Sequence, residues 1–170
     1  MIIDLGSVGA EARMIKRTIE ADEIDLTNED IELTGPIELV AEIGKQATKT
    51  KLTGTIGTSI SRDCTRCLEP VTGDLAFEFE TSFVDAENGD SRADAEVSIE
   101  DLDISLVEDG KIDLADVVRE QILLALPIQI FCKDDCKGMC PKCGGNLNLI
   151  DCKCSDDEID PRWAALKGLK

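Results

Sequence analysis

The segment Lys49-Thr-Lys-Leu-Thr-Gly-Thr-Ile-Gly-Thr-Ser-Ile-Ser61, followed closely by Cys64-Thr-Arg-Cys67, decides the expected fold. Its threonine and isoleucine content is typical of a long β-strand, in which the glycines could mark bulges. After the cysteine turn, residues 74–84 alternate apolar and polar side chains, which predicts a half-buried strand. The two strands are therefore expected to flank a turn that carries a pair of cysteines.

The neighbouring segments extend this strand pattern in both directions. Residues 12–20 and 31–43 are rich in isoleucine, threonine and valine with partial alternation, so we expect an antiparallel meander between about residues 12 and 84. Residues 85–94 are polar and contain Asn-Gly, which is typical of an exposed loop. Residues 95–107 offer two short strand candidates, and no internal repeat is evident.

Two helices are expected near the C-terminal end. Asp113 is a good N-cap for a helix over residues 113–126, which Pro127 ends. A shorter helix is expected to begin at Asp160, with proline at its first position. The apolar face of the first helix is expected to comprise Leu114, Val117, Val118, Gln121, Ile122 and Ala125. The fold class is therefore α+β, an antiparallel meander with one packed helix and a cysteine-rich module that ends in a short helix.

Charge is distributed unevenly along the chain. The net charge is −18, and residues 1–130 carry 29 acidic and 11 basic side chains, whereas residues 131–170 carry seven of each. Residues 85–109 are the most acidic stretch, with ten acids and one arginine. Such a field repels phosphate backbones and attracts basic proteins, although acids also simply solvate a surface.

Eight cysteines form two groups. The first is the pair at the strand turn, and the second lies in the C-terminal region around Cys140-Pro-Lys-Cys143-Gly. No apolar run approaches the length of a membrane span and no signal peptide is evident, so we expect a cytoplasmic protein whose thiols stay reduced. Clustered cysteines in that compartment indicate metal ligands. The candidate ligands are Cys64, Cys67, Cys132, Cys136, Cys140, Cys143, Cys152 and Cys154.

The chemistry of the ligands favours one or two structural zinc ions. The chain has no histidine, so each site would be all-cysteine, and a closed shell of four sulfurs leaves no open position for catalysis. An iron–sulfur cluster is a lesser alternative, since the spacing matches neither common ferredoxin pattern. A thioredoxin-like role for the Cys64 and Cys67 pair fits poorly, because that motif begins a helix in a βαβ unit. The chain is therefore not expected to be an enzyme.

The partition of the ligands and the domain boundaries are further expectations. If two sites form, Cys64 and Cys67 are expected to pair with Cys140 and Cys143, which leaves Cys132, Cys136, Cys152 and Cys154 for the second site. Residues 1–130 are expected to form an acidic, β-rich domain. Residues 131–170 would then be a zinc module with the C-terminal helix, docked on the first domain through the cysteine pair of the turn.

Long blocks of the sequence resemble the YceD family of bacterial and plastid proteins. They are Asp30-Ile-Glu-Leu-Thr-Gly-Pro-Ile-Glu-Leu, Cys64-Thr-Arg-Cys67-Leu-Glu-Pro, Glu120-Gln-Ile-Leu-Leu-Ala-Leu-Pro127, Cys136-Lys-Gly-Met-Cys140-Pro-Lys-Cys143-Gly-Gly-Asn-Leu-Asn148 and Ile159-Asp-Pro-Arg-Trp-Ala-Ala-Leu-Lys167. The resemblance implies a role in the accumulation of large-subunit ribosomal RNA. It also implies a gene neighbour that encodes a large-subunit ribosomal protein.

Three functions remain open at this point. The first is a non-catalytic factor in large-subunit assembly that acts through a basic ribosomal protein or a pre-ribosomal particle. The second is a zinc module that binds ribosomal RNA directly, which the negative charge and the scarcity of aromatic residues disfavour. The third is a redox- or zinc-responsive regulator. Neither a membrane nor a small-molecule substrate is expected as a partner.

Overall fold

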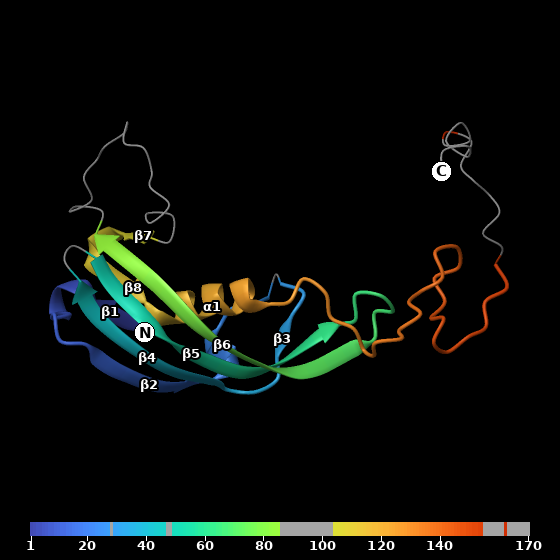
Figure 1. The fold of residues 1–170 in the computed structure, drawn as a ribbon, viewed down its shortest axis with the longest axis horizontal. Coiled ribbons are helices and arrows are strands. Elements are labelled where there is room, and N and C mark those ends of the chain that lie inside the picture. The colour runs from blue at the N-terminus through green and yellow to red at the C-terminus, as the bar shows by residue number, and fades with distance from the viewer. Residues whose placement is uncertain (28, 47–48, 86–103, 155–161, 163–170) are drawn as a thin grey trace. The chain divides into compact units, whose positions relative to one another are not determined.

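The computed structural model describes the chain except for residues 28, 47–48, 86–103, 155–161 and 163–170. It divides the chain into two compact units (Figure 1). The first unit comprises Met1–Arg62 and Thr72–Ile128, and the second comprises Asp63–Val71 and Gln129–Lys170. The turn with the first cysteine pair therefore belongs to the same unit as the C-terminal cysteines.

The first unit is built on a twisted sheet whose strands follow one another in space in the order β2-β4-β5-β6-β7. These strands are β2 (Arg13–Ile19), β4 (Ile37–Gln46), β5 (Lys49–Asp63), β6 (Pro70–Asp85) and β7 (Ile104–Val107). Strand β4 pairs antiparallel with both β2 and β5, whereas β7 pairs parallel with β6. The expected meander is therefore confirmed, and β7 adds a parallel edge to it.

Alternating burial gives the sheet an inner and an outer face. Along β4, Ile37, Leu39, Ala41 and Ile43 are buried, while the residues between them are exposed or half-buried. Strands β5 and β6 alternate in the same way, so their apolar residues meet on one side of the sheet. A period of two directs every second side chain to the core, which is why the sequence pattern located these strands correctly.

Two details of the strands differ from the sequence expectations. Residues 31–43 do not form one strand, because the chain breaks at residues 34–36 between β3 (Glu32–Leu33) and β4; proline has no N–H to donate there. The glycines of β5 mark no bulge either. The register between β4 and β5 runs without interruption from the Glu38–Gly57 pair to the Gln46–Lys49 pair.

The helix α1 (Leu114–Ala125) supplies the other half of the core. The Asp113 side chain accepts a hydrogen bond from the Ala115 N–H and so caps the helix as expected. Leu114, Val117, Val118 and Ile122 are buried, whereas Gln121 and Ala125 are half-buried. In Figure 1 the helix lies along the sheet, so its apolar face and the inner face of the sheet enclose one core.

Short elements complete the first unit. Strand β1 (Ile2–Asp4) pairs antiparallel with β8 (Lys111–Asp113), a pairing that the sequence did not predict. The 3₁₀ turns are η1 (Leu5–Ser7), η2 (Ala21–Glu23) and η4 (Glu108–Gly110). Of the expected loop over 85–94, Asp85 is the last residue of β6 and residues 86–94 lie outside the described residues. The first strand candidate before residue 104 and, apart from Arg162, the C-terminal helix also lie outside them. Among the described helices, none has the length and apolar character needed to cross a membrane.

Replacing Val118 with aspartate tests the buried face of α1. Val118 is fully buried, so Val118→Asp should bury an unpaired carboxylate and lower the free energy of unfolding by at least about 3 kcal/mol. Leu124 lies on the same helix but is 72% exposed, so Leu124→Asp should change stability by less than about 0.5 kcal/mol. Urea unfolding followed by circular dichroism measures both; equal effects would show that this face is wrongly assigned.

Replacing Gly54 with alanine tests the close approach of β4 and β5. A Cβ atom at Gly54 would lie 2.6 Å from the Cα and 2.7 Å from the Cβ of Ala41, so one strand would have to move. We expect Gly54→Ala to cost about 2 kcal/mol through this crowding. Gly57 is the matched control in the same strand, because a Cβ there meets nothing within 4 Å. Thermal melts in which Gly57→Ala is the more destabilised variant would contradict the register described here.

Candidate metal centres

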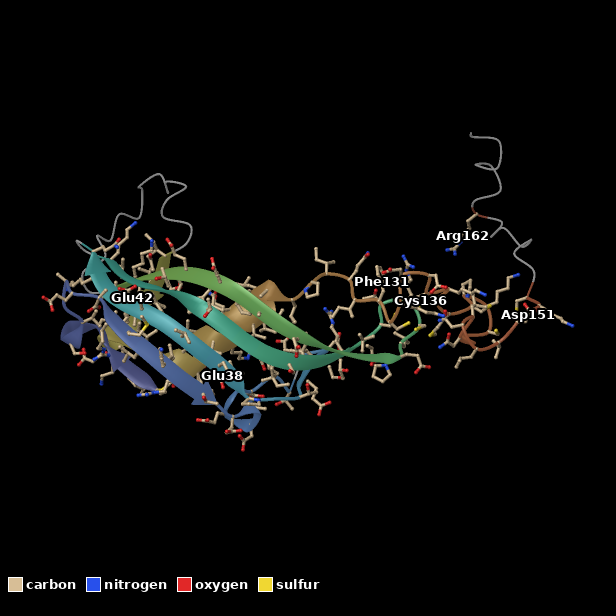
Figure 2. The ribbon with its side chains drawn as sticks, turned by 60° about the horizontal axis from the view of Figure 1, so that its bottom comes forward. Glu38, Glu42, Phe131, Cys136, Asp151 and Arg162 are labelled. Atoms are coloured by element: carbon tan, nitrogen blue, oxygen red, sulfur yellow. The ribbon has the colours of Figure 1, made fainter. Side chains whose placement is uncertain are left out.

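The second unit brings all eight cysteines together in two groups of four. Within each group the sulfur atoms all lie within 4.8 Å of one another. The first tetrad is Cys64, Cys67, Cys132 and Cys136, and the second tetrad is Cys140, Cys143, Cys152 and Cys154. The expected partition is therefore wrong, because the turn pair meets Cys132 and Cys136 and not the Cys140 and Cys143 pair. Figure 2 labels Cys136 in this unit.

Local chain geometry explains the error in the partition. Two Cys-x-x-Cys turns are each a two-ligand half-site, and spacing alone does not say whether two such turns combine with each other. In the structure each turn recruits a different short segment instead. The cysteines of the first turn lie beside Cys132 and Cys136. Those of the second turn lie beside Cys152 and Cys154, which follow that turn closely in the sequence.

The two Cys-x-x-Cys turns have the same backbone design. In the first, the Leu68 N–H donates to the Cys64 carbonyl (2.9 Å) and the Cys64 N–H donates to the Glu69 carbonyl (2.8 Å). In the second, Gly144 donates to Cys140 (2.9 Å) and Cys140 donates to Gly145 (2.9 Å). The turns thus form a structural repeat, six residues long, that the sequence did not reveal.

A positive φ angle follows the second cysteine in both turns. The φ angle is 59° at Leu68 and 70° at Gly144. Glycine adopts this conformation at no steric cost, whereas a leucine resists it. Because leucine and glycine differ so much in side chain, the two turns look unrelated in the sequence although their backbones match.

Sulfur–sulfur distances fit a tetrahedral ion and do not fit disulfides. In the first tetrad Cys64 and Cys136 are 3.8 Å apart and Cys67 and Cys132 are 3.5 Å apart. In the second, Cys152 lies 3.5 Å from Cys143 and 3.4 Å from Cys140. A tetrahedron with metal–sulfur bonds of about 2.3 Å requires sulfur–sulfur distances of about 3.8 Å, and a disulfide requires about 2.05 Å. Each tetrad could therefore hold one metal ion.

Backbone N–H groups of both turns favour the thiolate form that binds metal. Burial raises the pKa of Cys64, but N–H groups of Arg66, Cys132 and Cys67 donate to its sulfur and bring the pKa down to about 6. The N–H groups of Cys143 and Lys142 likewise lower the pKa of Cys140 to about 6. The neighbouring Cys67 sulfur raises the pKa of Cys132 to about 12, and the neighbouring Cys152 sulfur raises the pKa of Cys154 to about 12. A cation at the centre of each group would relieve this crowding of sulfurs.

Two asparagines that the sequence reasoning missed support the first tetrad. The Asn148 side-chain amide donates to the Cys136 sulfur (3.4 Å) and to the Asn146 side-chain oxygen (2.8 Å). Asn146 in turn donates to the Glu69 carboxylate (3.2 Å) beside the first turn. Such hydrogen bonds orient a ligand and stabilise its charge. Both asparagines follow the second Cys-x-x-Cys turn, so they link the segment of the second tetrad to the ligands of the first.

Burial differs between the two tetrads. In the first, Cys64, Cys67 and Cys136 are buried and only Cys132 is exposed. In the second, Cys140 is buried, Cys152 is half-buried, and both Cys143 and Cys154 are exposed. The first tetrad is also held by the Thr65 N–H, which donates to the Ile130 carbonyl (2.9 Å), and by the Arg66 side chain, which donates to the Cys136 carbonyl (3.1 Å). Chelators and oxidants therefore reach the second tetrad more easily.

The structure thus defines the class of this protein: an acidic α+β protein with two four-cysteine tetrads that could each hold a metal ion. The family model described as large ribosomal RNA subunit accumulation protein YceD matches residues 52–170. A protein of Bacillus subtilis named as the uncharacterized protein YlbN is 30% identical over 153 residues, covering 89% of this chain and 84% of its own length. The chain therefore belongs to the YceD family.

Two further relatives are longer than this chain. A chloroplastic protein of Arabidopsis thaliana, named large ribosomal RNA subunit accumulation protein YCED homolog 1, is 28% identical over 79% of this chain and 49% of its own length. An uncharacterized protein of Mycobacterium tuberculosis is 36% identical over 68% of this chain and 53% of its own. The chain thus spans about half the length of these two relatives. No solved structure matches the chain.

Single Cys→Ser variants test the division into tetrads. Loss of one sulfur should release the ion of its own tetrad and leave the other ion bound, so each variant should lose about one metal ion per chain. Elemental analysis should place Cys64, Cys67, Cys132 and Cys136 in one group. After mild chelation, variants of this group should lose their remaining ion faster than variants of the other four, because that ion sits in the more exposed second tetrad. Grouping of Cys64 with Cys140 would contradict the structure.

Proposed function

We propose that this protein is a non-catalytic factor in the biogenesis of the large ribosomal subunit, required for the accumulation of its ribosomal RNA. Membership of the YceD family carries the proposal, because the family model and the plastid relatives from Arabidopsis and maize bear the name of large ribosomal RNA subunit accumulation. The protein works in the cytoplasm, where ribosomal subunits are assembled in bacteria.

The tetrads support a structural role for the metal. We assign zinc to both, with all eight cysteines as ligands, because four thiolates in a tetrahedron are its preferred structural site. Four sulfurs complete the coordination shell, so neither ion has a position for substrate or water. The chain also contains no histidine that could transfer protons beside such a site. Metal analysis of the pure protein should find two zinc ions per chain; iron would reject the assignment.

Charge supports a basic protein as the partner. The second unit carries eight basic and nine acidic residues, and the first carries the other ten basic and 27 acidic residues. A four-thiolate zinc site adds a net −2, so metal binding makes the chain more negative. Ribosomal proteins of the large subunit are basic. An acidic protein can hold such a partner in solution and release it to ribosomal RNA, whose phosphates offer a denser negative field.

Direct binding to RNA is the weaker alternative. In the described part of the second unit, six basic residues are nearly balanced by five acids; they are Arg66, Lys133, Lys137, Lys142, Lys153 and Arg162 against Asp63, Glu69, Asp134, Asp135 and Asp151. The Arg66 guanidinium already lies over the Phe131 ring, 4.0 Å from its centre, so that face is not open to a nucleobase. The exposed second tetrad favours a redox- or zinc-responsive role only as an addition to this function.

Affinity capture from cells tests the proposal. The tagged wild-type protein should retain basic large-subunit proteins at low salt and lose them steeply as salt rises. We expect the acidic segment, residues 85–109, to attract the basic partner. Replacing its acids Asp85, Glu87, Asp90, Asp94 and Glu96 by the corresponding amides in one variant should therefore reduce this capture and lower the level of large-subunit RNA. Unchanged capture and unchanged RNA in that variant would reject the role of the acidic segment. Tight, salt-sensitive binding of the pure wild-type protein to naked RNA would favour the alternative.

A further inference from the structure

The outer face of the sheet in the first unit carries a shallow trough over β2, β4, β5 and β6. Its volume is about 920 Å³ including open solvent, and Thr53, Gly54 and Thr55 of β5 form its middle. Met14 on β2 and Glu42 on β4 lie opposite each other in the strand pairing, as do Glu42 and Thr53. Side chains of three neighbouring strands are therefore in register here, and Glu78 and Glu80 of β6 line the far side.

Small residues on β5 explain the hollow. The outward-facing threonines of β5 separate the longer side chains of β4 from those of β6, whereas Gly54 lies in register with the inward-facing Ala41. The pairing of Gly54 with Ala41 also lets the two strands approach closely, since a Cβ at Gly54 would clash with Ala41. This arrangement is rigid, because the inward neighbours Leu39, Leu52 and Ile56 are fully buried in the core.

The trough combines apolar and acidic groups. Met14 and Val40 are 60% and 38% exposed and lie diagonally across β2 and β4, since Met14 pairs with Glu42 two residues further along. Glu42, Glu78 and Glu80 surround them. Cations also border the trough: Lys51 forms an ion pair with Glu80 (2.6 Å), and the exposed Lys16 of β2 lies in register with Val40. Figure 2 labels Glu42 and, further along the same strand, Glu38, which is also exposed.

We propose that this trough, formed by Met14, Val40, Glu42, Thr55, Glu78 and Glu80, is the docking surface for an extended basic segment of the protein partner. The inference rests on the proposed function and specifies where the partner binds. Lysine and arginine side chains have aliphatic stems that cover apolar surface and charged ends that reach carboxylates. The apolar residues and the surrounding acids match those two parts of one side chain.

Charge distinguishes this occupant from the others. Nucleic acid would place phosphates against three carboxylates, which is repulsive. A second copy of this chain would bring a further net charge of −18 to the same face. The trough is also open and shallow, whereas small-molecule sites enclose most of their ligand. A basic polypeptide is the occupant for which both the shape and the charge are favourable.

Binding of a synthetic peptide tests the docking surface directly. The probe is a fluorescent peptide of alternating lysine and valine, and its counterpart has glutamate in place of lysine. Wild-type protein should bind the lysine peptide and not the glutamate peptide. The triple variant Glu42→Gln, Glu78→Gln, Glu80→Gln should bind it at least about tenfold more weakly. Thr55→Arg, at an exposed position in the middle of the trough, should abolish binding without affecting the core.

A matched variant controls for net charge. Asp22→Asn, Glu32→Gln, Glu120→Gln removes three exposed acids of the first unit outside the trough and should leave binding within about twofold of wild type. Equal weakening by the two triple variants would reject the trough in favour of a diffuse field. Thermal melts of all variants should match wild type, and Thr55→Lys, which places a cation at the same exposed position and should also abolish binding, replaces Thr55→Arg if that variant unfolds.

Cellular capture separates failure of the trough from failure of the function. If wild type and Thr55→Arg capture large-subunit proteins equally, the docking surface is wrong and the proposed function stands. If the wild-type protein captures none, the proposed function fails whatever the peptide binds. If the wild-type protein and the control variant capture large-subunit proteins and the trough variants do not, the result supports both the docking surface and the proposed function.

Discussion

In each tetrad four sulfur atoms lie within 4.8 Å of one another, and the described part of the second unit is built around these two groups; in the first tetrad the sulfurs come from distant parts of the chain. Cys64 and Cys67 come from the turn between β5 and β6, whereas Cys132 and Cys136 follow the helix. The described residues of this unit bury only a small cluster around the cysteines and so have little hydrophobic core of their own. The metal ions that we propose for the two tetrads would supply the cohesion that hydrophobic burial supplies in the first unit.

The supporting contacts follow from this constraint. Thiolates confined at 3.4–3.8 Å from one another need both a cation and hydrogen-bond donors. The Cys-x-x-Cys turns supply backbone N–H groups, and Asn148 supplies a side-chain donor to Cys136. Gly138, with a φ angle of 75°, lies against the Arg66 carbonyl, where a Cβ would be 3.1 Å from the oxygen, so this position also favours glycine. The second tetrad shares the turn design but leaves two of its sulfurs exposed.

The first unit depends on hydrophobic burial and provides the surface. Its core is aliphatic with two buried phenylalanines, Phe79 and Phe83, which accounts for the low aromatic content of the chain. Its acids are displayed on the strands that this core holds in register. The candidate metal ligands therefore lie in one unit, and most of the excess acidic residues lie in the other.

Features that depend on local periodicity and residue chemistry could be predicted from the sequence. Alternation located β2, β4, β5 and β6, and Asp113 with Pro127 bounded α1, because strand and helix periods are properties of short windows. The absence of histidine and the clustering of cysteines determined the ligand type. Three features became visible in the folded chain: which cysteines share a tetrad, the support that Asn146 and Asn148 give to the first tetrad, and the pairing of β1 with β8. These depend on which distant segments meet in space, and spacing along a chain does not specify a meeting between segments 65 or more residues apart.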